Sequence, residues 1–186
     1  SFGLLFDHLR SVGKSFDEKE TRELYDYALN YCLGRGGERA YLENAGALYR
    51  ELLENEIILQ DGKIAPQVLK NIVVIHCVIG KLDWVAGFLE AFQHRLLPPA
   101  NPLTITYNRA VLTFYQQDRA CIALFKQVIS QLKDDVFYEL DARIYLIKSY
   151  FEYRDTLTIG ETDEMFRMHV SFKTFIDRNQ KISEIH

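Results

Sequence analysis

Residues 121–128 have the sequence CIALFKQV, in which Cys121, Phe125 and Val128 follow one another at steps of four and three. Such steps place side chains above one another on a helix of 3.6 residues per turn, so this segment is predicted to be a helix with one buried face. The same spacing recurs in the triplets Ala45/Tyr49/Leu52, Val85/Leu89/Phe92 and Met168/Phe172/Phe175. Helical units that recur roughly every 40 residues are typical of an α-solenoid, whose stacked units share one core.

Length and composition suit one domain over residues 1–186, because 48% of the 186 residues are apolar and 26% are charged. The longest apolar run, residues 72–79, contains a histidine and is far shorter than the roughly 20 residues that a membrane span requires. A net charge of -4 and a pI near 5.7 disfavour nucleic acids, whose binders usually carry a basic surface. We therefore expect neither a membrane nor a nucleic acid as the partner.

The cysteine content predicts a cytoplasmic protein. Cys32, Cys77 and Cys121 form neither an even disulfide set nor a metal-binding pair, so reduced and buried thiols are expected. The sequence contains no Asn-x-Ser/Thr sequon and does not begin with a signal sequence. It begins at Ser1 without a methionine and stops at His186 beside a helical pattern, so we expect it to be a piece of a longer protein.

Turn and capping residues divide the chain into about eight or nine helices joined as hairpins. Gly34 and Gly80 are expected to end helices, and Pro66 and Pro102 to begin them. No segment alternates apolar and polar residues as a strand does, so the chain is predicted to be all-α. The expected helix pairs cover about residues 17–54, 66–95, 102–132 and 135–179, with a capping box at Ser15 and Glu18, a turn at Asp61-Gly62, acidic residues Asp134 and Asp135 before a helix, and a loop over 155–162.

The first helices of these pairs carry stripes of their own, namely Leu24/Tyr27/Ala28/Tyr31, Leu69/Ile72/Val73/His76, Asn108 with Ala110, and Ala142/Tyr145/Leu146. Together with the triplets on the second helices, these stripes resemble tetratricopeptide-repeat (TPR) proteins over about residues 20–180. More narrowly, residues 70–73, 82–84, 135–138 with 140–143, and 178–183 look like a group of uncharacterised bacterial repeat proteins. The resemblance implies a right-handed α-solenoid of antiparallel helix pairs.

The resemblance also implies a concave groove lined by the first helix of each pair. Positions one and five residues after the first stripe residue face this groove, and two asparagines lie one position further along. The implied groove residues are Tyr25, Leu29, Lys70, Asn71, Val74, Tyr107, Asn108, Val111, Arg143 and Ile147. Asparagine amides can pair with the backbone of an extended peptide, and Lys70 and Arg143 can neutralise its carboxylates.

Charge is distributed unevenly along the chain. Residues 63–119 contain 6 basic and 3 acidic residues, whereas residues 17–56 contain 5 basic and 10 acidic ones. This excess can be chance variation of solvated faces, or it can mark a site for an acidic peptide.

The motifs of common enzyme classes are missing from this sequence. It contains no GxGxxG, GxxxxGK[ST], HExxH or GxSxG, and no histidines at metal-ligand spacing. His76 and Cys77 are adjacent, but neighbours on a helix point about 100° apart, so a core histidine is the simpler interpretation. Trp84 can be a binding anchor or part of the helix packing. No catalytic residue, metal site or cofactor is therefore predicted.

Two hypotheses for function follow from these observations. The favoured one is a non-catalytic module that binds a peptide or protein segment in the concave groove. The alternative is a structural unit whose exposed repeat faces pair with copies of itself as a homo-oligomer. An enzyme is a third and weaker reading.

Overall fold

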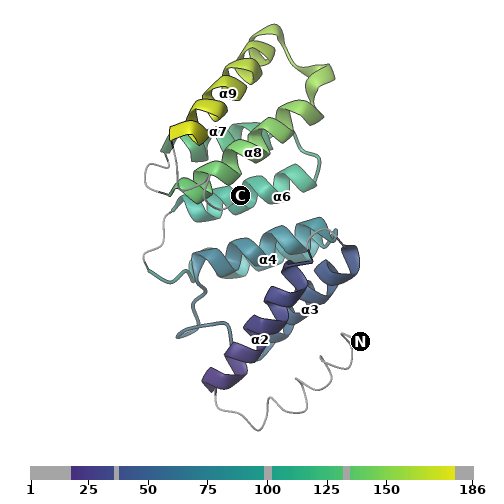
Figure 1. The fold of residues 1–186 in the computed structure, drawn as a ribbon, viewed down its shortest axis with the longest axis vertical. Helices are drawn as coiled ribbons and strands as arrows, with labels where there is room; N and C mark the ends of the chain where they lie inside the picture. Colours follow the sequence, from purple (N-terminus) through teal and green to yellow (C-terminus); the bar gives the residue numbers. More distant parts are fainter. Residues whose placement is uncertain (1–17, 36–37, 99–101, 132–134, 179–186) are drawn as a thin grey trace. The chain divides into compact units, whose positions relative to one another are not determined.

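The computed structural model describes residues 18–35, 38–98, 102–131 and 135–178, and in these residues the chain is helical, with two isolated bridges and no β-strand (Figure 1). The all-α prediction is therefore confirmed for this part of the chain. The elements are α2 (Glu18–Leu33), α3 (Arg39–Glu54), α4 (Pro66–Val78), α5 (Leu82–Phe92), α6 (Leu103–Tyr115), α7 (Cys121–Gln131), α8 (Val136–Glu152), the 3-10 helix η2 (Arg154–Thr156) and α9 (Ile159–Arg178).

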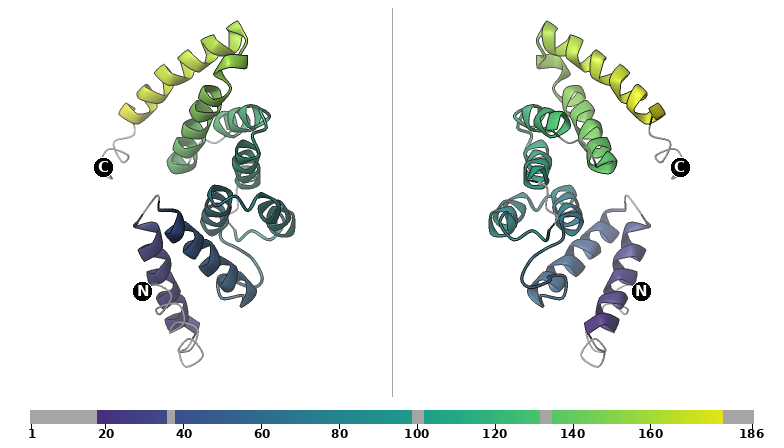
Figure 2. Two further views of the ribbon diagram at one scale, coloured as in Figure 1. Left: turned by 90° about the vertical axis from the view of Figure 1, so that its right-hand side faces the viewer. Right: turned by 90° about the vertical axis from the view of Figure 1, so that its left-hand side faces the viewer.

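The helices divide between Ala100 and Asn101 into an N-terminal unit, which contains α2 to α5, and a C-terminal unit, which contains α6 to α9. In each unit, helices that follow one another in sequence contact one another. Figure 2 shows both units from two further sides, including the short connection with η2 that joins α8 to α9. One continuous solenoid over residues 1–186 stays a prediction.

The boundaries of α4 follow from a proline and a glycine, as predicted. Pro66 occupies the first helical position, where its missing amide would have no helical partner. Gly80 adopts a φ of +80° after the helix, and its amide donates to Cys77 O at 3.0 Å, while the amide of Lys81 donates to His76 O at 2.8 Å. These two bonds form a Schellman motif, which ends α4 and turns the chain into α5.

The connector between α3 and α4 is an ordered loop built around the predicted turn. Asp61 and Gly62 both have positive φ, 50° and 70°, as in a type I′ turn, and Gln60 exchanges two backbone hydrogen bonds of 2.9 Å with Lys63. The amide of Ile64 then donates to Arg95 O at 2.8 Å. The connector is thereby attached to the segment that follows α5.

In the N-terminal unit, the predicted stripes of α3 and α4 are buried. Leu69, Ile72, Val73 and His76 are each 0% exposed. Gly46 of α3 lets the two helices approach closely, because a Cβ added there would lie 3.0 Å from Ile79 Cδ1. His76 donates from Nδ1 to Ile72 O at 2.8 Å and stacks on Trp84 at a centroid distance of 4.2 Å. His76 is therefore a core residue, and Trp84 takes part in the packing of α5 on α4.

The stripe predicted for α2 is only partly buried, because Ala28 is 3% exposed but both tyrosines are accessible. Tyr27 and Tyr31 were expected in the buried stripe, but they are 74% and 45% exposed. The buried face is formed instead by Thr21, Tyr25, Ala28, Leu29 and Cys32. Both sets repeat with helical spacing, and tyrosine is amphipathic enough to occupy either face, so the pattern alone could not separate them. The capping box at Ser15 lies outside the described residues.

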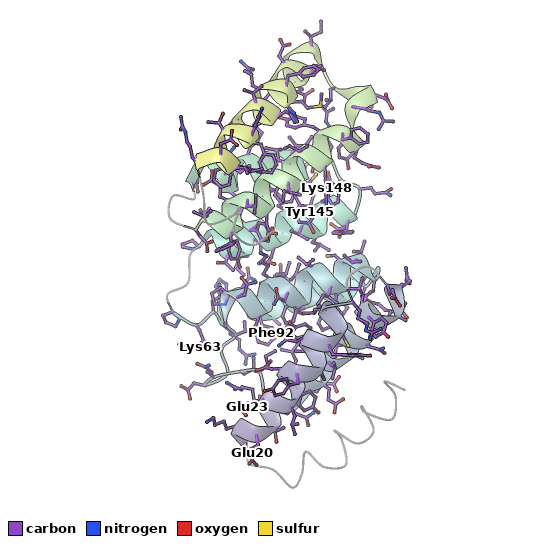
Figure 3. The ribbon with its side chains drawn as sticks, in the orientation of Figure 1. Glu20, Glu23, Lys63, Phe92, Tyr145 and Lys148 are labelled. Atoms are coloured by element: carbon purple, nitrogen blue, oxygen red, sulfur yellow. The ribbon has the colours of Figure 1, made fainter. Side chains whose placement is uncertain are left out.

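Aromatic rings from three helices form the centre of the C-terminal unit. Phe125 of α7 stacks on Tyr145 of α8 at 5.4 Å, and Tyr107 of α6 contacts Phe125 and Tyr138 edge-on, at 6.3 and 5.0 Å. Tyr145 is labelled in Figure 3 beside Lys148, whose Nζ lies 5.4 Å from the ring centroid. The triplet Cys121/Phe125/Val128 is fully buried, which confirms the spacing on which the fold prediction rests.

The last helix begins earlier than predicted, because residues 159–162, expected in a loop, belong to α9. Thr158 and Glu161 form a capping box: the amide of Thr158 donates to Glu161 Oε2 at 2.8 Å, and the amide of Glu161 donates to Thr158 Oγ1 at 3.3 Å. Bonds from Thr158, together with Arg119, lower the pKa of Glu161 to about 2. None of residues 159–178 is buried, so Met168, Phe172 and Phe175 are half-buried at most.

Phe125→Ala should lower the free energy of unfolding by about 3–5 kcal/mol, because it removes a fully buried ring from the aromatic centre. Urea unfolding measures this loss. Phe137→Ala is the matched control, since Phe137 is 53% exposed and its loss should stay below about 1 kcal/mol. Equal losses for the two variants would contradict the packing described here.

The stability of the protein should fall as the pH drops below about 6.5, the usual pKa of histidine. Burial lowers the pKa of His76 in the folded chain, so between that pKa and 6.5 the unfolded state binds the additional proton. The contribution of neutral His76 to the free energy of unfolding is fully present above pH 6.5. Below pH 6.5 this contribution decreases by at most about 1.4 kcal/mol per pH unit. Urea unfolding at pH 7.0 and 5.5 should show a smaller difference for His76→Gln than for the parent, whereas His94→Gln, at an exposed position, should behave as the parent does.

Candidate functional site

A pocket of about 380 Å³ opens in the N-terminal unit between α2, α3, α4 and the connector. The side chains that line it from α2 include Arg22, Asp26, Leu29 and Leu33, which follow one another at steps of four, three and four residues. This spacing places them on one helix face, next to the face that packs in the core. The pocket is therefore bounded on one side by a regular helical surface.

The floor and the opposite wall of the pocket come from the other two helices. Tyr49 and Leu52, both buried, belong to the α3 triplet predicted from the sequence. Val68 and Asn71 of α4 and Leu97, after α5, also line the pocket. The floor is thus mostly apolar, as binding pockets for side chains usually are.

Polar side chains surround this floor and fix its shape. Arg22 Nη2 donates to Ile57 O at 2.6 Å, which attaches the connector to α2. Gln67 Nε2 donates to Asn71 Oδ1 at 3.1 Å. Burial raises the pKa of Tyr49, against the opposing effect of a hydrogen bond with Asn71, so its hydroxyl stays protonated at neutral pH. Asn30 and Gln60 are exposed at the rim, where their amides can both donate and accept hydrogen bonds.

Four of the predicted groove residues are not accessible to a ligand. Tyr25 is 5% exposed, and Tyr107, Asn108 and Val111 are each 0% exposed. Asn108 Nδ2 donates instead to Thr104 O at 2.8 Å. In α2 and α6, the register implied by the resemblance places core positions in the groove. The burial of these four side chains shows that this register is wrong.

Leu29 is also only 5% exposed, whereas the other remaining predicted residues are half-buried. Lys70, Asn71 and Val74 are on α4, where Asn71 lines the pocket, and Leu29 of α2 lines it as well. Arg143 is engaged within the C-terminal unit: its Nη2 lies 2.7 Å from Glu139 Oε1, and its guanidinium carbon lies 4.8 Å from the Phe175 ring centroid. A groove shared by Lys70 and Arg143 would join the two units and stays a prediction.

The connector residues of the pocket, Ile57, Ile58 and Gln60, were not predicted to belong to a site. The predicted helix pairs end at about residue 54 and resume at about residue 66, so these residues were expected only to join helices. Two adjacent isoleucines in a loop were the available signal, since exposed loops are usually polar.

The side chains that could act as nucleophiles or metal ligands do not form a site. Cys32, Cys77 and Cys121 are free and buried, as predicted, and burial raises the pKa of the Cys77 thiol to about 12, which disfavours a reactive thiolate. Among the described residues, no group of three or more His, Cys, Asp or Glu is placed to hold a metal ion. In the same part of the chain, no helix is long and apolar enough to cross a membrane.

None of the family models, curated proteins or solved structures with which the chain was compared matches it. The resemblance to TPR proteins therefore rests on residue spacing alone.

Proposed function

We propose that this chain is a non-catalytic protein-interaction module of the TPR-like, α-solenoid type, and that its N-terminal unit binds an extended segment of a partner protein. The observation that carries the proposal is the pocket between α2 and α4, which combines an apolar floor with a polar rim. A groove of this kind receives an apolar side chain, while amides at its edge pair with the backbone of the ligand.

The geometry of the pocket favours a peptide anchored by one large side chain. A volume of about 380 Å³ is near the lower end of the range for small-ligand sites, so it suits one or two side chains of a longer segment. The three amide side chains that line the pocket, Asn30, Gln60 and Asn71, come from three different elements. Arg22 and Asp26 carry opposite charges on the same wall, so the pocket itself gives no net preference for an acidic ligand. The acidic partner suggested by residues 63–119 remains part of the proposal for the wider surface.

A cytoplasmic location is part of this proposal, and it is supported by three free, buried cysteines. The alternative function, assembly with copies of the same chain, is favoured by a separate observation on α9.

The pocket can be tested with peptides selected from a displayed random library on the complete chain and then titrated individually. Val68→Trp should fill the pocket and weaken binding about tenfold or more, which corresponds to about 1.4 kcal/mol. Val78→Trp is the matched control, because Val78 is on the same helix, is 39% exposed and does not line the pocket. It should leave the affinity unchanged.

Two results would contradict the proposal: peptides that bind Val68→Trp as tightly as the parent, or no enrichment of any peptide. Asn71→Ala provides a second test of peptide affinity, since it removes an amide that lines the pocket without filling the pocket. A smaller loss of affinity is expected for it than for Val68→Trp.

A further inference from the structure

Helix α9 carries a second apolar face, which points away from the rest of the C-terminal unit. The inner face contains Phe175, against which Arg143 of α8 packs. The opposite face contains Ile159, Asp163, Phe166, Val170, Lys173 and Asp177, all of them exposed. Their steps of four, three, four, three and four residues are those of a heptad seam, the pattern by which one helix packs along another. Figure 1 shows α9 at the edge of its unit, beside α8.

The apolar residues of this seam are unusually accessible. Ile159 is 85% exposed, Phe166 62% and Val170 65%. A shallow hollow beside the last two is lined by Phe166, Arg167, Val170 and Ser171. Large apolar side chains grouped on one accessible face mark an interaction surface more often than scattered ones do.

The seam carries two opposite charges, Asp163 and Lys173, at equal distances along the helix from Met168. Consider two α9 helices that lie antiparallel, with the two-fold axis at the level of Met168. A residue that lies a given number of positions before Met168 then faces the residue that lies the same number of positions after Met168 in the second copy. Phe166 then faces Val170 of the second copy, and Asp163 faces Lys173 of the second copy. In the central part of the seam, apolar residues therefore face apolar residues and opposite charges face each other, and each contact occurs twice.

We propose that α9 is a self-association surface, on which a second copy of this chain docks its own α9 in antiparallel orientation. A parallel pair would place Asp163 opposite Asp163 and Lys173 opposite Lys173, which repel each other. At the ends of the antiparallel seam Ile159 faces Asp177, so the favourable region is short and the dimer is weak. This surface is independent of the pocket proposed for peptide binding.

Sedimentation of the complete chain over a range of concentrations tests the proposal. The parent should form a dimer, and Phe166→Glu should weaken the association about tenfold or more, because it places a charge in the apolar centre of the seam. Phe151→Glu is the matched control: Phe151 is 64% exposed but belongs to α8, so the variant should associate as the parent does. A parent chain that stays monomeric at all concentrations, or equal losses for the two variants, would overturn the proposal.

A charge exchange separates this antiparallel pair from other modes of association. Asp163→Lys alone and Lys173→Asp alone should each weaken the homodimer, since like charges then face each other in both contacts. The double variant should associate as the parent does, and an equimolar mixture of the two single variants should form a heterodimer. If the double variant associates no better than either single one, the second copy docks elsewhere or the occupant of this face is a different protein.

Discussion

Burial of one apolar stripe per helix, at steps of four and three residues, is the constraint on which both units depend. The stripe of α3 buries Ala45, Tyr49 and Leu52, and that of α7 buries Cys121, Phe125 and Val128. A helix with a single stripe is stabilised by a neighbour rather than by its own propensity, so each helix requires the ones beside it. In the C-terminal unit the requirement is met by aromatic rings from α6, α7 and α8, which contact one another through Phe125 and Tyr145.

The pocket also depends on the packing of helices on the buried stripe of α3. Both α2 and α4 contact α3, and the α3 residues Tyr49 and Leu52 pack in the core while also forming the pocket floor. The connector completes the wall because Arg22 holds Ile57 and because Ile64 is bonded to the chain after α5. The pocket therefore depends on contacts between segments far apart in sequence.

These dependencies explain which features could be predicted from the sequence. Helix boundaries at Pro66 and Gly80 were predictable because the backbone geometry at each is determined by that residue. The buried face of α2 was not predictable, because two sets of residues on this helix have helical spacing. Only the packing of the neighbouring helix selects between the two sets. Two residues that line the pocket, Leu29 and Asn71, had been assigned to a groove of different extent, and the pocket itself was not predicted because its walls depend on how the connector folds back. The start of α9 was predictable in principle from the Thr158 and Glu161 box.

Helix α9 is held differently from the other helices, and this difference bears on its outer face. Its attachment to the unit includes ion pairs of 2.6 Å from Glu161 to Arg119 and from Glu164 to Lys126, and its inner aromatic residues are half-buried. Charged contacts of this kind fix the orientation of a helix but remove little apolar surface from water. On its outer face, α9 exposes Ile159, Phe166 and Val170. Pairing of two such helices would remove this surface from water in both copies, and the Asp163 and Lys173 charges would restrict the pairing to one orientation.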